Sequence, residues 1–257
     1  MHSERHVGLW MVGGAALAFL YVPLAVMGIL SFNDAALSMK WQGWTLKWYE
    51  RLVGNQALWA SLMVSLKVAI WSSLVATIVG LCAAVALERR KVRGLESTLL
   101  LPLVVPEIMM GVGFMLCFAI LKVPLGITTV ILAHAAFNTP LVAVLIRSRL
   151  RKLDASLEEA ARDLGATPAQ AFWRVTLPML RPAILGAALL TFTVSLDDFL
   201  VTFFTSGPGA TTLPLRVYSL IRSGVTPEIN ALSSVMVLAS MLLVLGAVLL
   251  QRDRTAR

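Results

Sequence analysis

Long uncharged runs alternate with short charged segments along the whole chain. An α-helix needs about 20 mainly apolar residues to cross the hydrocarbon core of a bilayer. The pattern predicts six such spans in a single transmembrane domain covering residues 1–257, at residues 8–30, 58–87, 97–121, 126–146, 183–205 and 231–250. The first run is too long for a signal-peptide core and lacks a convincing cleavage site, so we expect it to be retained. The predicted fold class is an all-α membrane protein with six transmembrane helices.

The composition agrees with this interpretation. Apolar residues make up 58% of the chain and charged residues 14%, and the mean hydropathy is +0.81. Soluble domains carry roughly 25% charged residues, so a chain of this composition could not cover a globule with polar surface. The 2 cysteines, Cys82 and Cys117, lie inside apolar stretches. That placement excludes a disulfide scaffold and a cysteine-based metal site.

The distribution of basic residues predicts the orientation. With the N-terminus in the cytoplasm, 15 of the 22 Lys and Arg residues fall on the cytoplasmic side and 6 on the outer side, with Lys67 inside a span. Basic residues in short loops concentrate on the cytoplasmic side of membrane proteins. Both termini are therefore predicted to be cytoplasmic, and the formal charge of +8 needs no nucleic-acid partner.

The loop between the first two spans contains three tryptophans at three- and four-residue spacing, Trp41, Trp44 and Trp48. This spacing predicts an amphipathic helix with one aromatic face. Tryptophan is enriched at the membrane–water interface, which favours a helix resting on the bilayer. A docking surface for an external partner is compatible with the same pattern.

Residues 147–182 read as two short helices separated by a glycine. Ser156 and Glu159 fit a capping box that opens the first helix, and Gly165 stands where a helix ends with a left-handed residue. Thr167 and Pro168 then repeat a helix start, and Pro178 is expected to stop the second helix. A DNA-binding helix-turn-helix is excluded, because the second helix is apolar and is held between two spans.

The pattern Glu159-Ala160-Ala161, then Gly165, then Val175-Thr176-Leu177-Pro178 resembles the EAA loop of bacterial binding-protein-dependent ABC importer permeases. In that family the loop helices sit in a cleft of the ATPase subunit. The resemblance therefore implies an ATPase-coupling site at Glu159, Ala160, Ala161, Gly165, Leu177 and Pro178.

The resemblance to these permeases covers essentially the whole chain. It implies the type I importer architecture in a bacterial inner membrane, with a second similar permease, two cytoplasmic ATPase subunits and a periplasmic binding protein as partners. ATP and Mg would be bound by the partner ATPase, and this chain would bind no cofactor of its own. Residues 195–199, 206–214 and 226–231 resemble the polyamine branch of the family, which implies putrescine or spermidine as cargo; another small solute stays the alternative.

Ionisable side chains interrupt the predicted spans at Lys67, Glu107, His134 and the adjacent pair Asp197 and Asp198. A charge at the centre of a bilayer costs roughly 2.5–3.5 kcal/mol on insertion scales, so such residues usually face a cavity or a partner. An acidic interior would suit the passage of a polycation. We therefore predict a substrate path along Glu107, Asp197, Asp198 and His134.

Structural roles for these residues stay open. Lys67 could form a buried ion pair with Asp197 or Asp198, and His134 could be a hydrogen-bonded packing residue. Neighbouring helix residues are about 100° apart, so at most one of the two aspartates should point straight into a pore. Pro102 and Pro106 are expected to kink the third span around Glu107.

Other functions fit the sequence poorly. Two adjacent aspartates on one helix cannot form the facing dyad of an intramembrane protease, and no Ser–His pair or metal-ligand cluster has a recognisable spacing. No phosphate-binding loop occurs, so the chain cannot be the ATPase, and a non-catalytic transport subunit is expected. A stand-alone secondary transporter is the remaining rival, but it often shows two related halves, which are not visible here.

Overall fold

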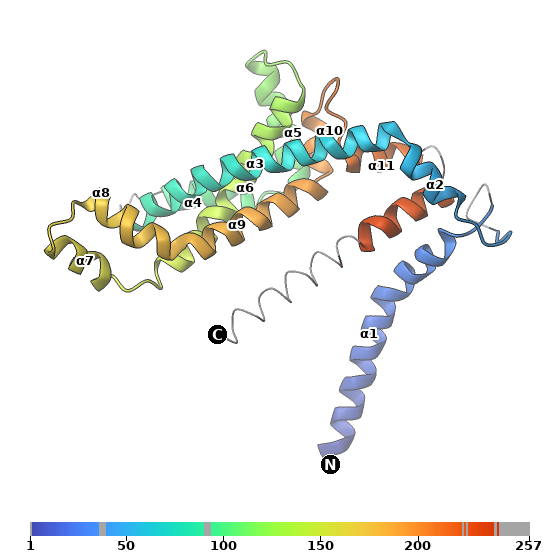
Figure 1. Cartoon of the computed structure of the whole chain (residues 1–257), viewed down its shortest axis with the longest axis horizontal. Coiled ribbons are helices and arrows are strands. Elements are labelled where there is room, and N and C mark those ends of the chain that lie inside the picture. The colour runs from blue at the N-terminus through green and yellow to red at the C-terminus, as the bar shows by residue number, and fades with distance from the viewer. Residues whose placement is uncertain are drawn as a thin grey trace. The chain divides into compact units, whose positions relative to one another are not determined.

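The computed structural model describes residues 2–35, 40–89, 94–222, 224, 226–238 and 241, with the side chains of residues 2–9 and 95 left aside. Residues 227–238 are helical, but most of the predicted span 231–250 lies outside the described residues. The basic residues at 90–93 and beyond 250, which entered the orientation argument, also lie outside them. Throughout the described part, the regular elements are helices (Figure 1).

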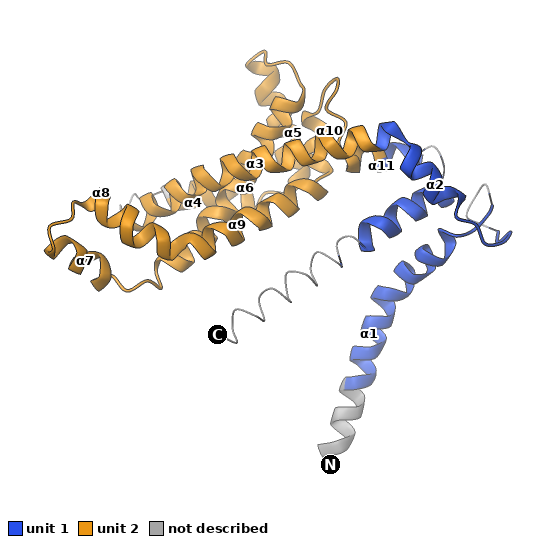
Figure 2. Cartoon of the chain, viewed as in Figure 1, with its two compact units in different colours: residues 1–58, 217–257 blue, residues 59–216 orange. Residues whose placement is uncertain are grey.

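Four helical segments among the described residues are long and apolar enough to cross a membrane, at Trp10–Leu30, Gln56–Arg89, Ile127–Leu150 and Pro168–Asp197. A bent pair, Glu96–Leu103 with Glu107–Ile120, would make a fifth span. The chain divides into two compact units, residues 1–58 with 217–257 and residues 59–216 (Figure 2).

The first unit contains α1 (His2–Leu30) and α2 (Lys47–Gly54), joined by a loop folded around Asn33. The buried Asn33 side chain accepts the Gln42 N–H at 2.9 Å and donates to the Lys40 carbonyl at 2.8 Å. Its own carbonyl accepts the indole N–H of the buried Trp48 at 2.7 Å. Asn33 therefore holds the two ends of the loop together.

The predicted amphipathic helix through the three tryptophans is wrong. Only Trp48 lies in a helix, whereas Trp41 and Trp44 lie in extended loop, with Trp44 in an isolated bridge to Asn33. Trp48 is buried, and the other two tryptophans are exposed. The hydrogen bonds of Asn33 favour the loop over a helix, because asparagine side chains compete with helical backbone bonds.

The second unit is built on three long helices that run side by side, α3 (Gln56–Arg89), α6 (Ile127–Leu150) and α9 (Leu177–Asp197) (Figure 1). Small and branched side chains fill their shared core, which lets the helices approach closely as in other membrane bundles. The core residues are Ala76, Ala84, Val142, Ile146, Leu180 and Ala187. Shorter helices lie toward the two ends of this bundle, α7 (Ser156–Asp163) and α8 (Pro168–Ala171) at one end and α5 (Glu107–Ile120) and α10 (Leu200–Thr205) toward the other (Figure 1).

The third predicted span is bent, as its prolines indicate. It consists of α4 (Leu95–Leu100), the 3-10 turn η1 (Leu101–Leu103) and α5 (Glu107–Ile120), and the two parts meet at 112°. Pro102 lies in the 3-10 turn and Pro106 immediately precedes α5. Proline lacks the N–H that an uninterrupted helix requires, which explains the break at this point.

The fifth predicted span is not one continuous helix. Helix α9 ends at Asp197, Asp198 is extended with ψ 127°, and the short helix α10 runs over Leu200–Thr205. The break falls at the paired aspartates. Aspartate is a poor residue for a helix interior because its carboxylate competes for backbone N–H groups, and here Asp198 does so.

The prediction that Pro178 stops the second loop helix is also wrong. Helix α8 (Pro168–Ala171) continues through a π-helical segment, η2 (Phe172–Thr176), directly into α9. In the wide turn the Leu177 N–H bonds to the Phe172 carbonyl five residues back. A wide turn of this kind loosens the backbone just before Pro178, which lets the helix pass a residue that cannot donate a hydrogen bond.

Candidate substrate path and coupling loop

The break between α9 and α10 is held by the side chain of Asp198. Its Oδ1 accepts the Thr202 backbone N–H at 2.9 Å and the Thr202 hydroxyl at 3.0 Å. Asp198 thus caps the first turn of α10, whose leading N–H groups have no partner within the helix. The Asp198 side chain, which interrupts the predicted span, therefore positions α10, the second part of that span.

His134 of α6 lies behind this carboxylate and is almost fully buried, with 1% of its surface exposed. Its Nε2 lies 3.1 Å from Asp198 Oδ1 and 2.9 Å from the Thr202 hydroxyl. Its Nδ1 lies 2.7 Å from the Ser195 hydroxyl. Both ring nitrogens therefore have partners, which fixes the orientation of the ring and ties α6 to both sides of the break.

The hydrogen-bonded network continues into α3. The Ser195 hydroxyl lies 2.8 Å from that of Ser72, and the Ser73 hydroxyl lies 3.0 Å from that of Thr191. Ser72, Ser195 and Thr191 are all buried. Buried polar groups of this kind are stable only when paired, so the network specifies how α3, α6 and α9 pack around the break.

An open pocket of about 450 Å³ lies on the other side of Asp198. Its lining brings together Glu107, at the start of α5, with Asp197 and Asp198. Asp197 is exposed, whereas Asp198 is buried and its Oδ2 has no hydrogen-bond donor among the described residues. The pocket therefore offers carboxylate oxygens to a ligand that can donate hydrogen bonds or carry positive charge.

Helix packing places Glu107 beside the break. Helix α5 lies against α10, and Gly111 sits one turn after Glu107 at the contact. A Cβ at position 111 would lie 2.8 Å from the Phe204 ring and 3.2 Å from the Leu200 carbonyl. The glycine thus allows the close approach that brings the first turn of α5 to the acidic pocket.

The other two ionisable residues predicted at membrane depth lie outside the pocket. Lys67 is exposed and, within the described part of the chain, forms no ion pair; the partner of Asp198 is His134, so the predicted alternative of a Lys67–aspartate bridge is wrong. His134 contacts Asp198 from behind and does not line the pocket. Sequence reasoning missed Ser72, Ser195 and Thr202, because hydroxyl side chains carry no signal until helix packing pairs them.

The loop between α6 and α9 forms the predicted helix, elbow and helix. Helix α7 (Ser156–Asp163) ends in a Schellman motif, in which the Ala166 N–H bonds to the Ala161 carbonyl at 3.1 Å and the Gly165 N–H to the Arg162 carbonyl at 2.9 Å. Gly165 has a φ of +90°, a conformation that other L-residues rarely adopt. The elbow therefore needs glycine because of this backbone conformation. A side chain at position 165 would meet no neighbouring atom within 4 Å.

Of the two predicted capping boxes, the one before α8 is present and the one before α7 is not. Thr167 and Gln170 form the expected capping box ahead of α8. The predicted box at Ser156 and Glu159 is wrong, because the Asp154 carboxylate accepts the Ser156 N–H at 3.0 Å in its place. This backbone hydrogen bond lowers the pKa of Asp154, since it stabilises the charged form.

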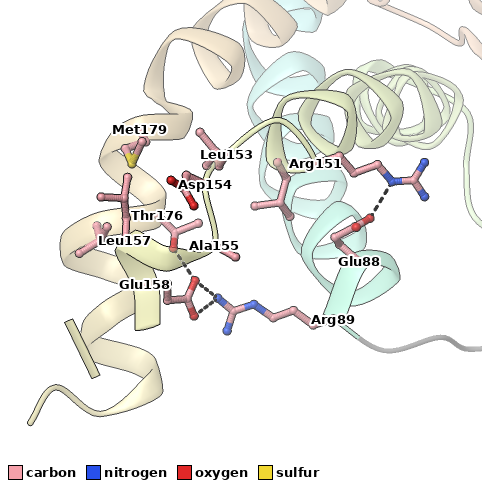
Figure 3. A pocket seen from close by; sticks show the side chains of 12 residues that line it. Glu88, Arg89, Arg151, Leu153, Asp154, Ala155, Leu157, Glu158, Thr176 and Met179 are labelled. Atoms are coloured by element: carbon pink, nitrogen blue, oxygen red, sulfur yellow. Dashed lines mark hydrogen bonds and ion pairs between the residues drawn. The ribbon is translucent and has the colours of Figure 1, made fainter. Parts of the chain in front are cut away.

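Three of the six predicted coupling residues are exposed, and the other three are half-buried. Glu159, Ala160 and Gly165 are open to solvent, Ala161 is half-buried, and Leu177 and Pro178 are half-buried at the start of α9. The opposite side of α7 faces a pocket of about 270 Å³, where Glu158 meets Arg89 and Thr176 (Figure 3). None of these three residues was predicted as a site residue. Thr176 stood only within the loop motif, and the signal for Glu158 was its place beside Glu159 in an acidic doublet.

Long apolar helices, an acidic pocket at a helix break and a solvent-exposed helix–elbow–helix define the chain as a membrane transport component. The model of the family described as "Binding-protein-dependent transport system inner membrane component" matches residues 76–252. The chain belongs to this family of ABC transporter permeases. The match includes the acidic pocket, His134 with its partners Ser195, Thr202 and Asp198, and the loop between α6 and α9, whereas Ser72 and Ser73 lie before it.

Named relatives and a solved structure agree with this assignment. The chain is 45% identical over 240 residues to the putrescine transport system permease protein PotI of Escherichia coli K12, covering 90% of this chain and 83% of that protein. It is 36% identical over 255 residues to the spermidine/putrescine transport system permease protein PotC of the same strain, covering 97% of each chain. A bacterial ABC transporter that imports the acidic polysaccharide alginate has a chain of similar fold, with a TM-score of 0.72 at 17% identity, covering 98% of each chain.

Proposed function

We propose that this chain is a permease subunit of an ATP-driven polyamine importer in a bacterial inner membrane. The observation that carries the proposal is the 45% identity to a putrescine permease across 90% of the chain. The acidic pocket supports it independently, because a polyamine carries several ammonium groups and loses its hydration on entering the membrane. Carboxylate oxygens within the bilayer replace part of that hydration.

The proposed topology has six spans with both termini in the cytoplasm, so that α7 and α8 project from the cytoplasmic side. The excess of basic residues on that side supports this orientation. A second, similar permease completes the pore, two ATPase subunits bind the coupling loops, and a periplasmic binding protein delivers the cargo. ATP and Mg belong to the ATPase subunits, and this chain supplies the path and the coupling loop.

The substrate path runs past Glu107, Asp197 and Asp198. The exposed Asp197 and the unpartnered Oδ2 of Asp198 supply acceptors for an ammonium group. His134 has a different role from the one first assigned to it: it holds Asp198 in place without lining the pocket. This arrangement makes Asp198 a fixed group at the pocket wall and Asp197 the exposed acid beside it.

Coupling uses the exposed side of the loop at Glu159, Ala160, Ala161 and Gly165, together with Leu177 and Pro178 where the loop enters α9. The small alanines allow a partner surface to approach the helix closely. Closure of the ATPase subunits moves α7 and α8, and the continuous helix from Pro168 to Asp197 extends that motion to the acidic pocket.

Co-purification and reconstitution test the proposal. The tagged chain, isolated from its host in mild detergent, should retain a second permease and an ATPase, identified by mass spectrometry. The purified chain alone in liposomes should move no putrescine, with or without ion gradients. Gradient-driven uptake by the single chain would overturn the proposal in favour of a secondary transporter.

A further inference from the structure

An ion pair on the inner side of the coupling loop joins three helical segments that are far apart in the sequence. Arg89 is the last residue of α3, and its Nη2 donates to both carboxylate oxygens of Glu158 on α7, at 2.8 and 2.9 Å (Figure 3). The Thr176 hydroxyl of η2 donates to the same carboxylate at 2.7 Å. The Arg89 guanidinium also lies over the Phe172 ring, 5.2 Å from its centre.

These contacts separate the roles of two neighbouring acidic residues. Glu158 and Glu159 are about 100° apart around the helix, so they face different directions. Glu158 is half-buried and turned toward α3, whereas Glu159 is exposed and, in the part of the chain that the structure describes, has no ion pair. Glu158 therefore faces the helix bundle, and Glu159 is accessible to a partner subunit.

The Arg89–Glu158 ion pair joins α7 to α3. The backbone connects α7 to α6 on one side and, through Gly165 and α8, to α9 on the other. Helix α3 has no such connection to the loop, and among the described residues Arg89 and Glu158 form the ion pair between α3 and α7. Motion of α7 can therefore act on α3 through this pair.

Helix α3 also reaches the hydrogen-bonded network behind the acidic pocket. Ser72 of α3 hydrogen-bonds to Ser195, which hydrogen-bonds to His134, and His134 holds Asp198. The 34-residue helix thus has the coupling loop at one end and the network behind the pocket near its middle. Packed helices and hydrogen bonds that run continuously between two sites are a physical route for energetic coupling.

We propose that Arg89 and Glu158 form a strut that transmits the motion of the coupling loop to α3 and from there to the acidic pocket. The inference rests on the proposed coupling function and assigns new positioning residues to it. We expect the strut to contribute little to the free energy of unfolding. Its side chains are 39% and 27% exposed, and exposed ion pairs contribute little to folding.

Charge variants in the reconstituted complex with its ATPase and binding protein test the strut. Glu158→Gln and Arg89→Gln should each lower putrescine uptake per ATP hydrolysed about fivefold, while subunit assembly and the unfolding temperature stay at the wild-type values. The conservative Arg89→Lys should fall between, because lysine keeps the charge and loses the planar fork. The exchanged pair, Arg89→Glu with Glu158→Arg, should recover at least half of the lost coupling.

Glu88→Gln is the matched control. Glu88 precedes Arg89 on the same turn of α3 but pairs with Arg147 of α6 and with Arg151, the residue directly after α6, and not with α7. It should leave uptake per ATP unchanged. Equal effects of Glu88→Gln and Glu158→Gln, or a wild-type ratio in both Glu158→Gln and Arg89→Gln, would overturn the strut.

A readout that does not depend on the cargo separates this proposal from the proposed function. Stimulation of ATP hydrolysis by the loaded binding protein should drop in Glu158→Gln and return in the exchanged pair. If the wild-type complex moves no polyamine, the proposed cargo fails. The ATPase stimulation, with whatever cargo the binding protein carries, then still decides for or against the strut.

Discussion

Asp198 Oδ1 and His134 Nε2 lie 3.1 Å apart at the point where α9 breaks and α10 begins. The histidine is buried behind the aspartate, and the acidic pocket lies in front of it. The pair therefore fixes one carboxylate at the pocket wall and connects it to helices α3 and α6 through Ser195 and Ser72. A break in a membrane helix is tolerated where buried polar groups satisfy the backbone in this way.

Removing the imidazole should destabilise the protein. His134→Leu leaves Ser195, Thr202 and Asp198 without a ring nitrogen partner, which should cost about 3 kcal/mol of unfolding free energy, because buried polar groups lose their hydrogen bonds. Thermal unfolding of the detergent-solubilised complex measures the loss. His134→Gln, whose amide both donates and accepts, should recover part of it; an unchanged unfolding temperature in His134→Leu would contradict the network.

Neutralising the pocket should slow transport without loosening the fold. Glu107→Gln, Asp197→Asn and Asp198→Asn keep side-chain size, and each should slow uptake about tenfold at most, since 1.4 kcal/mol of lost stabilisation of the passing cation gives a factor of ten. Binding of polyamine by the periplasmic protein should not change. Uptake at the wild-type rate in all three variants would remove the acidic path.

Two controls make that test specific. Glu50→Gln removes an exposed charge from α2 and should not slow uptake. Lys67→Met, added to Asp198→Asn, should neither rescue nor worsen the variant, because Lys67 has no ion pair within the described residues. Rescue by Lys67→Met would mean that the lysine pairs with the aspartate in another state of the transporter.

The elbow of the coupling loop should depend on its glycine. Gly165→Val forces a branched residue to a φ of +90°, which costs about 1–2 kcal/mol for a left-handed L-residue and favours a reoriented α8. We expect normal insertion with loss of most ATP-driven uptake. Gly209→Ala, at a φ of +77° in a turn outside the coupling loop, is the control and should retain coupling.

The loop between α1 and α2 should depend on Asn33. Asn33→Ala removes the side-chain bonds to Lys40 and Gln42, which should open the loop to limited proteolysis in membrane vesicles. Asp34→Ala is the matched control: its ion pair with Lys47 is exposed, and exposed pairs contribute roughly 0–1 kcal/mol. Equal protection of both variants would show that Asn33 does not organise the loop.

Apolar run length predicted the long helices well, because a bilayer imposes a minimum length on any span. The predicted runs at 58–87 and 126–146 correspond to α3 and α6, and the helix–elbow–helix follows from local residues such as Gly165 and Thr167. The breaks were harder to predict. Proline indicated the bend before Glu107, but the break at Asp198 depends on His134, which is distant in sequence.

The sequence predicted which acidic residues form the pocket, but not how their side chains are arranged in it. Carboxylates at membrane depth indicated Glu107, Asp197 and Asp198, and the fold brings all three to one pocket. Which aspartate is fixed and which is exposed depends on helix packing. The Arg89–Glu158 pair was missed for the same reason, since 69 residues separate the partners and each has charged neighbours in the sequence.

The most direct test of the proposed polyamine import is ATP-driven uptake of labelled putrescine into proteoliposomes that contain the complete complex and its binding protein. We predict uptake that requires ATP, competes with excess spermidine and ignores excess 1,4-butanediol, which has the same length and no charge. ATP-dependent uptake of a non-amine solute with none of putrescine, or putrescine uptake that follows an ion gradient without ATP, would contradict the account.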